Sequence, residues 1–138
     1  MNVKVPPQYA MKHSNLNGYQ TILKQIDQTK SPSIFKDNGC TYTEYQDKSG
    51  KVILTVKQYD GESNVICEYF GENGNFTQLQ DFENDKKLNL MSQRDKDTGV
   101  WTKQYDYNQD GTFDESIPET KDGLSFISIK APLDGGKR

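Results

Sequence analysis

Five oxygen-bearing side chains alternate along one short stretch in the C-terminal third of the chain. Counted from Asp106, they occupy positions 1, 3, 5, 7 and 9, and Gly111 stands at position 6. Alternate residues of a tight loop can turn their oxygens inward around a Ca²⁺ ion, and the glycine permits the sharp bend. The spacing therefore predicts a calcium site. Its ligands would be Asp106, Asn108, Asp110, Thr112 and Asp114.

The second half of this motif departs from the calcium loop of an EF-hand. Position 12, where a bidentate Glu belongs, is Ile117, and the flanking residues favour strands rather than helices. The stretch is similar to the DxNxDG loops found outside true EF-hands, with Asp114 or Glu115 completing the ligand shell. Alternatively, the same residues form an Asx-rich hairpin turn whose carboxylates are solvated. The sequence leaves both interpretations open.

Aromatic side chains are the other residue type present in surplus, because they make up 11% of the chain. Tyrosines on a sheet can pair across strands and stabilise it. A set of them can also present a binding surface, as at many protein interfaces. The candidates for such a surface are Tyr42, Tyr45, Tyr59, Tyr69, Trp101, Tyr105 and Tyr107.

Residues that could carry out catalysis are few. His13 is the single histidine, and no second histidine is available to activate Cys40 or Cys67. No GxSxG, HExxH, P-loop or CxxC pattern occurs. The sequence therefore predicts no catalytic residue and no cofactor apart from calcium. The two cysteines either form one disulfide in an oxidising compartment or stay reduced and buried.

The overall composition limits the class of partner. The chain has 138 residues, a net charge of −3 and a pI of about 5.2. We therefore expect one domain, and nucleic acid is not an expected partner. No run approaches ~20 apolar residues, which argues against membrane insertion. The absence of a visible signal peptide predicts a cytoplasmic protein if Met1 is the native start, and an extracellular one if a targeting segment was removed.

Hydrophobic spacing predicts one helix near the N-terminus. Four apolar residues follow the 3.6-residue period and form one stripe. Asn17 is placed as the N-cap, and Ser31-Pro32 ends the helix because the residue before proline is pushed out of the α region. The pattern predicts a helix over about 18–30. The stripe consists of Leu16, Tyr19, Leu23 and Ile26.

From residue 37 onward, turn clusters rich in Asp, Asn and Gly separate segments with the length of ordinary strands. Connections this short permit antiparallel neighbours but not parallel crossovers. We therefore predict an α+β fold that is mainly antiparallel β. The helix packs on a meander of seven to eight strands that forms a curved sheet or partial barrel. The expected single domain comprises an extension (1–14), a helical segment (15–31), the meander (37–131) and a tail (132–138).

The meander also repeats itself. Lys57-Gln58-Tyr59-Asp60 recurs 46 residues later as Lys103-Gln104-Tyr105-Asp106. Self-similarity at a strand-plus-turn period is typical of repeated hairpins. These aromatic–Asp–turn units resemble, over residues 42–117, the tyrosine–aspartate (YD) repeats of RHS-type proteins and the β-hairpin repeats of MORN-like proteins. The resemblance implies a β-rich wrapping or interaction surface with no active site to carry over.

These observations favour a non-catalytic binding or interaction module of bacterial type, which acts through a tyrosine-rich sheet face or an edge strand. Three alternatives follow from the same residues. The first is a calcium-stabilised extracellular or surface module. The second is a small-ligand carrier or enzyme with a pocket between helix and sheet. The third is an acidic inhibitor of a nucleic-acid enzyme, which would imitate phosphates with its turn carboxylates.

Overall fold

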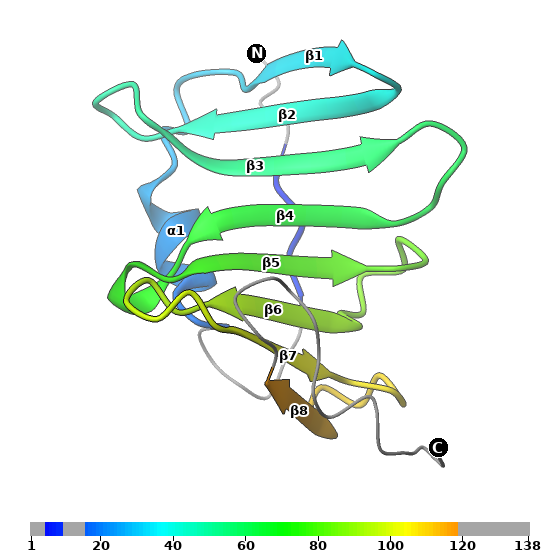
Figure 1. The fold of residues 1–138 in the computed structure, drawn as a ribbon. Helices are drawn as coiled ribbons and strands as arrows, with labels where there is room; N and C mark the ends of the chain where they lie inside the picture. The colour runs from blue at the N-terminus through cyan, green and yellow to red at the C-terminus, as the bar shows by residue number, and fades with distance from the viewer. Residues whose placement is uncertain (1–4, 10–15, 119–138) are drawn as a thin grey trace.

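The computed structural model describes residues 5–9 and 16–118 of the chain. In these residues one α-helix, α1 (Tyr19–Gln25), precedes a single sheet whose eight strands are all antiparallel and stand in sequence order (Figure 1). A single 3₁₀ turn, η1 (Glu72–Gly74), joins the fourth strand to the fifth. The prediction of a helix followed by an antiparallel meander is confirmed, and the sheet is not closed into a barrel. Its strands are β1 (Ser33–Asp37), β2 (Cys40–Gln46), β3 (Val52–Tyr59), β4 (Val65–Phe70), β5 (Phe76–Asp81), β6 (Leu90–Arg94), β7 (Trp101–Tyr105) and β8 (Glu115–Pro118).

The helix is shorter than the predicted 18–30. Its apolar stripe continues to Ile26, which is buried, but that residue already has extended backbone angles (φ −66°, ψ 132°). The reason lies in the sheet, because the N–H of Asp27 donates to the carbonyl of Gln46 at 2.8 Å. This hydrogen bond draws the chain out of the helix and along the end of β2.

The predicted N-cap is also wrong. Gly18 is the cap residue, in the left-handed region at φ 88°, and no side chain caps the helix. The Nδ2 of Asn17 instead donates to Oγ1 of Thr77 at 2.7 Å, so this side chain joins the helix entry to β5. A long-range contact has replaced the local one that the spacing suggested.

The meander begins earlier than residue 37. The predicted turn at Asp37–Gly39 is present, but it closes a hairpin whose first strand is β1. Asn38 and Gly39 have φ values of 50° and 76°, the pair of positive angles that a two-residue type I′ turn requires. The parts of the predicted layout at 1–4, 10–15 and 119–138, with His13, lie outside the described residues.

The register divides the strand residues between two faces. One face, here called the helix face, packs against α1 and the segment 5–9, which run behind the sheet in Figure 1. The opposite face, here called the front face, is turned toward the viewer. The buried core lies on the helix face and contains Tyr9, Leu16, Tyr19, Ile26, Tyr45, Leu54, Val56, Val65, Cys67, Tyr69, Leu79, Leu88 and Met91.

The two cysteines are free and both are buried. The register places Cys67 on the helix face and Cys40 on the front face, so the sheet itself separates them. Burial raises the pKa of the Cys67 thiol to about 12. Of the two interpretations, the reduced and buried one describes this structure.

Candidate functional site

Four side chains of the front face form a row across strands β4 to β7. The register sets Phe70 opposite Phe76, Phe76 opposite Arg94, and Arg94 opposite Trp101. The Phe70 and Phe76 rings meet edge to face with centroids 5.6 Å apart, and Phe76 meets Trp101 in the same way at 6.1 Å. Phe70 keeps 67% of its surface exposed. We call Phe70, Phe76, Arg94 and Trp101 the aromatic row.

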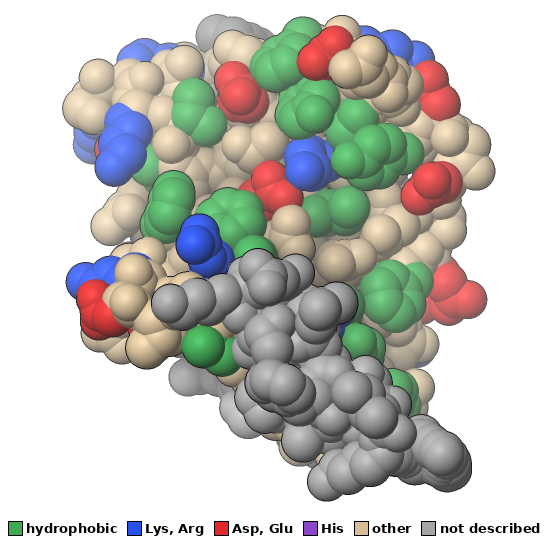
Figure 2. Space-filling view, viewed as in Figure 1, with side chains coloured by type: hydrophobic (Ala, Val, Ile, Leu, Met, Phe, Trp, Pro, Cys, Tyr) green, Lys and Arg blue, Asp and Glu red, His purple; other side chains and the backbone are tan. Residues whose placement is uncertain are grey.

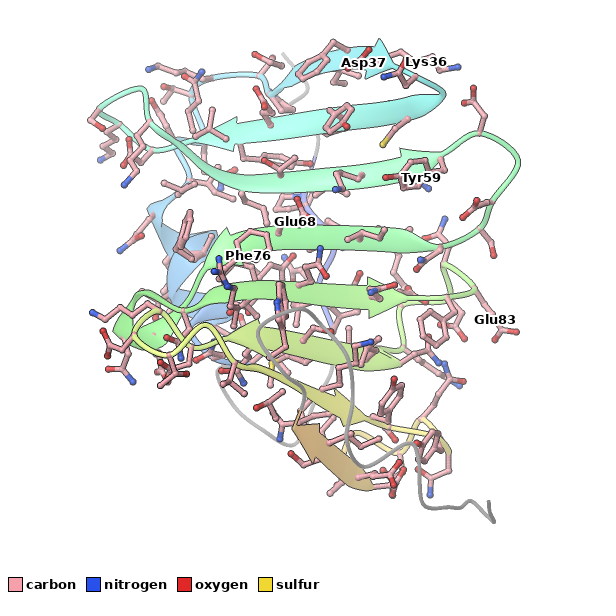
Figure 3. The ribbon with its side chains drawn as sticks, in the orientation of Figure 1. Lys36, Asp37, Tyr59, Glu68, Phe76 and Glu83 are labelled. Carbon is pink, nitrogen blue, oxygen red and sulfur yellow. The ribbon has the colours of Figure 1, made fainter. Side chains whose placement is uncertain are left out.

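A polar cluster lies beside this row on the same face. Lys57 Nζ is 3.0 Å from Glu68 Oε2, and Gln78 Nε2 donates to the same oxygen at 2.6 Å. Figure 3 labels Glu68 on β4 and Phe76 on β5, next to each other. Burial acts to lower the pKa of Lys57, but the hydrogen bond and charge of Glu68 outweigh it and raise that pKa. Only 18% and 16% of the Lys57 and Glu68 side chains is exposed, so this ion pair is poorly hydrated for an open sheet face.

Two further ring pairs complete the front face. Phe35 of β1 stacks on Tyr42 of β2 with centroids 5.0 Å apart. Tyr105 stacks on Tyr107 at 5.3 Å, and the Tyr107 hydroxyl donates to Glu115. Burial and the nearby Glu115 carboxylate raise the pKa of Tyr107. Figure 2 shows hydrophobic side chains on this face with acidic and basic ones between them.

The predicted tyrosine surface must be corrected, because its members lie on both faces. Tyr45 and Tyr69 are 2% and 3% exposed and belong to the core on the helix face, so they cannot form an open surface. The other predicted aromatic residues are on the front face or at its end. They are Tyr42, Tyr59, Trp101, Tyr105 and Tyr107.

Sequence reasoning missed the phenylalanines of the front face. Phe70 and Phe76 flank the turn at 71–75 and are directly paired across it. Pairing the flanks of each predicted hairpin could have placed these two rings together. Phe35 could not be found in this way, since its strand lies before the predicted start of the meander.

The acidic loop after β7 is built around Asp106. This residue is 1% exposed, and its carboxylate accepts the backbone N–H of Asp110 at 3.2 Å and of Gly111 at 2.9 Å. Asp114 Oδ2 accepts the N–H of Tyr107 at 2.8 Å. One carboxylate oxygen from each of Asp106, Asp110 and Asp114 lies within 4.8 Å of the others, so three of the five predicted ligands are close together.

The loop after β5 has the same architecture, displaced by 25 residues. Asp81 is also 1% exposed and accepts the N–H of Asp85 and of Lys86, as Asp106 accepts those of Asp110 and Gly111. Asn84 and Lys86 have positive φ, as do Gln109 and Gly111. Burial raises the pKa of Asp81. Three further hydrogen bonds recur in the two loops. The N–H of Lys87 donates to Asp85, as that of Thr112 donates to Asp110. The N–H of Phe82 donates to the Asn89 side chain and the N–H of Asn89 to the Gln80 carbonyl, as Tyr107 donates to Asp114 and Asp114 to Tyr105.

This equivalence bears on the calcium hypothesis. In the loop after β5, Asn89 occupies the position equivalent to Asp114, and Lys86 occupies the position equivalent to Gly111. The two loops nevertheless have the same pattern of hydrogen bonds and positive φ angles. The carboxylates of both loops are already engaged by backbone N–H groups. We therefore expect the loop after β7 to hold its shape through these hydrogen bonds alone.

The corresponding prediction concerns metal dependence. We expect the melting temperature to be the same with calcium and with EGTA, because Asp106, Asp110 and Asp114 each already accept a hydrogen bond from a backbone N–H group. Differential scanning calorimetry in both buffers makes the comparison. A higher melting temperature in calcium that Asp114→Asn removes would contradict this expectation and would support the calcium-stabilised module.

The interface between α1 and the sheet is filled by side chains. Tyr19 is fully buried against Tyr9 and Tyr69, with ring centroids 6.2 and 5.3 Å away. Two hollows border the helix: one of about 200 Å³ between Thr21 and Phe70, and one of about 440 Å³ between Gln25 and the turn that begins at Asp47. The larger lies within the ~300–1,000 Å³ of typical ligand pockets. A ligand carrier or enzyme with a helix–sheet pocket stays a prediction from the sequence.

No helix in residues 5–9 and 16–118 is long and apolar enough to cross a membrane. Comparison of the chain with protein-family models, with curated protein sequences and with solved structures gave no match.

Proposed function

We propose that this protein is a non-catalytic interaction module that binds another protein through the front face of its sheet. The observation that carries the proposal is the aromatic row, in which Phe70 is exposed next to Phe76, Trp101 and the guanidinium-bearing Arg94. Aromatic residues and arginine are the types enriched at interfaces and at their energetic centres.

The charge of this face favours a protein over a nucleic acid. Its basic side chains, Lys57, Arg94 and Lys103, alternate with acidic ones such as Glu68 and Glu115. A phosphate-binding surface needs a basic excess, and an acidic decoy of nucleic acid needs a one-sided negative field. The mixed charges support neither, whereas polar groups around an aromatic centre are the usual anatomy of a protein interface.

Paired baits test the proposal. Wild type, Phe70→Ser, Trp101→Ala and Phe82→Ser are used to capture proteins from an extract of the source organism, with identification by mass spectrometry. Phe82 is the matched control, because it is 40% exposed but follows the opposite end of β5. We expect wild type and Phe82→Ser to capture the same protein, and the two aromatic-row variants to lose it.

The captured protein is then purified and titrated against the module. Trp101 is the only tryptophan and lies in the aromatic row, so its emission reports binding there directly. We expect its emission to change on binding, and Phe70→Ser to weaken affinity about thirtyfold, the loss typical of an aromatic hot spot. Equal affinity of Phe70→Ser and wild type would refute the front face as the binding surface.

A further inference from the structure

Strand β1 is an edge whose outer side has no strand partner among the described residues. All five of its residues are exposed, with Ile34 at 56% and Phe35 at 46%. An exposed edge with apolar side chains on both faces is a template for adding another strand. The opposite edge, β8, ends in Pro118, a residue that cannot donate to a ladder.

The hairpin register shows which backbone groups point outward. In a two-residue hairpin the residues that flank the turn form a hydrogen-bonded pair, and such pairs alternate along the strands. Asp37, Phe35 and Ser33 therefore bond to β2. The N–H and C=O groups of Ile34 and Lys36 point away from the sheet. Gln46, the last residue of β2, lies beyond the residues that pair with β1, and its carbonyl accepts the N–H of Asp27 instead.

We propose that β1 pairs with β1 of a second copy of this chain, antiparallel and about a two-fold axis at Phe35. In this register Ile34 of each copy lies opposite Lys36 of the other, so outward-pointing groups meet and each pair exchanges both hydrogen bonds. Phe35 lies opposite itself at a non-hydrogen-bonded position, where side chains approach most closely. The interface is isologous and closes at two copies.

The side chains suit a second copy of the chain. Phe35 already stacks on Tyr42, so the contact would join the two stacks into one line of rings. Asp37 would face Ser33, which means that no like charges stand directly opposed. A lysine on an edge strand commonly prevents pairing with another chain. Here the charge of Lys36 is paired with Asp60 of its own chain, with Nζ 3.0 Å from Oδ1. Figure 3 labels Lys36 and Asp37 at the turn end of β1, leaving Ile34 and Phe35 at the centre of the contact.

Charge reversal at the two-fold axis gives the decisive experiment. Sedimentation velocity is run on the full chain up to about millimolar concentration, because a single added strand buries less than a standard interface. We expect wild type to form dimers, and Phe35→Glu and Phe35→Lys each to be monomeric alone. An equimolar mixture of the two should dimerise again, because opposite charges then meet at the axis. Phe82→Glu and Phe82→Lys are the matched controls and should behave as wild type.

Three results would overturn the proposal: a wild type that stays monomeric throughout, a dimer that persists in Phe35→Glu, or a mixture that fails to dimerise although both variants are folded by circular dichroism. If either variant is unfolded, Ile34→Pro decides, since it removes only an outward N–H. A folded, monomeric Ile34→Pro supports the proposal and a dimeric one refutes it. The inference does not depend on the aromatic row, so loss of either property leaves the other testable.

Discussion

Replacing Asp106 by alanine is expected to lower the free energy of unfolding by about 1–3 kcal/mol. The carboxylate is buried and accepts two backbone N–H groups, those of Asp110 and Gly111. Removing it leaves the buried N–H of Gly111 without its acceptor, whereas the N–H of Asp110 still donates to Asn108 Oδ1 at 3.3 Å. Each unsatisfied buried donor costs about 1–3 kcal/mol, which makes this one of the more severe single changes available outside the core.

The equivalent loop supplies an internal replicate of this prediction. Asp81→Ala should cost a similar amount, because Asp81 accepts the N–H groups of Asp85 and Lys86 in the same geometry. Asparagine at either position keeps one acceptor oxygen, so its cost should be smaller. Asp97, which is exposed, is the control and should change stability by less than about 0.5 kcal/mol on conversion to alanine.

Urea unfolding followed by circular dichroism measures these differences. Equal stability of Asp106→Ala and Asp97→Ala would show that the carboxylate does not hold the loop. A large loss for Asp106→Ala with none for Asp81→Ala would show instead that the two loops are stabilised differently, despite their matching hydrogen bonds.

The sequence predicted the meander well, because the signals that define it are local. Short turns of Asp, Asn and Gly permit only antiparallel neighbours, and the structure has each strand beside its predecessor. The duplicated tetrapeptide also has a structural counterpart, since Tyr59 and Tyr105 both lie at the end of a strand and on the front face. Whether the chain is related to YD or MORN-like repeat proteins stays a prediction.

The errors came from contacts between residues distant in the sequence. Apolar spacing could not reveal that Asp27 bonds to β2, nor that Asn17 binds Thr77 instead of capping the helix. The same limit applies to Gly71, which reads as an ordinary turn glycine. A Cβ atom there would lie 2.3 Å from the carbonyl oxygen of Asn17, so close packing of the helix entry requires the glycine.

Alternation alone could not say which face each tyrosine occupies. A shift of one residue in register exchanges the faces of a strand, and the sequence contains tyrosines at both parities. The helix sorts them, because α1 and the segment 5–9 cover one face and bury Tyr45 and Tyr69. The front face keeps the remaining aromatic residues, so the core and the proposed binding surface use opposite sides of one sheet.

Tyr19 is the helix residue that packs against the sheet and contacts both Tyr9 and Tyr69. It is fully buried, and its ring meets those of Tyr9 and Tyr69. Its hydroxyl donates to the carbonyl of Pro7 and lies 3.9 Å from the sulfur of Cys67. One side chain thus joins three parts of the chain: the segment 5–9, α1 and strand β4.

Truncation of this side chain should therefore have the largest effect of any single change considered. We expect Tyr19→Ala to lower the free energy of unfolding by about 3–5 kcal/mol, the range for deleting a buried aromatic ring. Tyr19→Phe keeps the ring and loses the hydrogen bond, so it should cost about 1 kcal/mol. Urea unfolding measures both. If Tyr19→Ala were no less stable than Tyr19→Phe, packing of the ring would not stabilise the contact between helix and sheet.

Tyr19→Phe should also leave binding at the aromatic row unchanged, because the sheet separates the two faces.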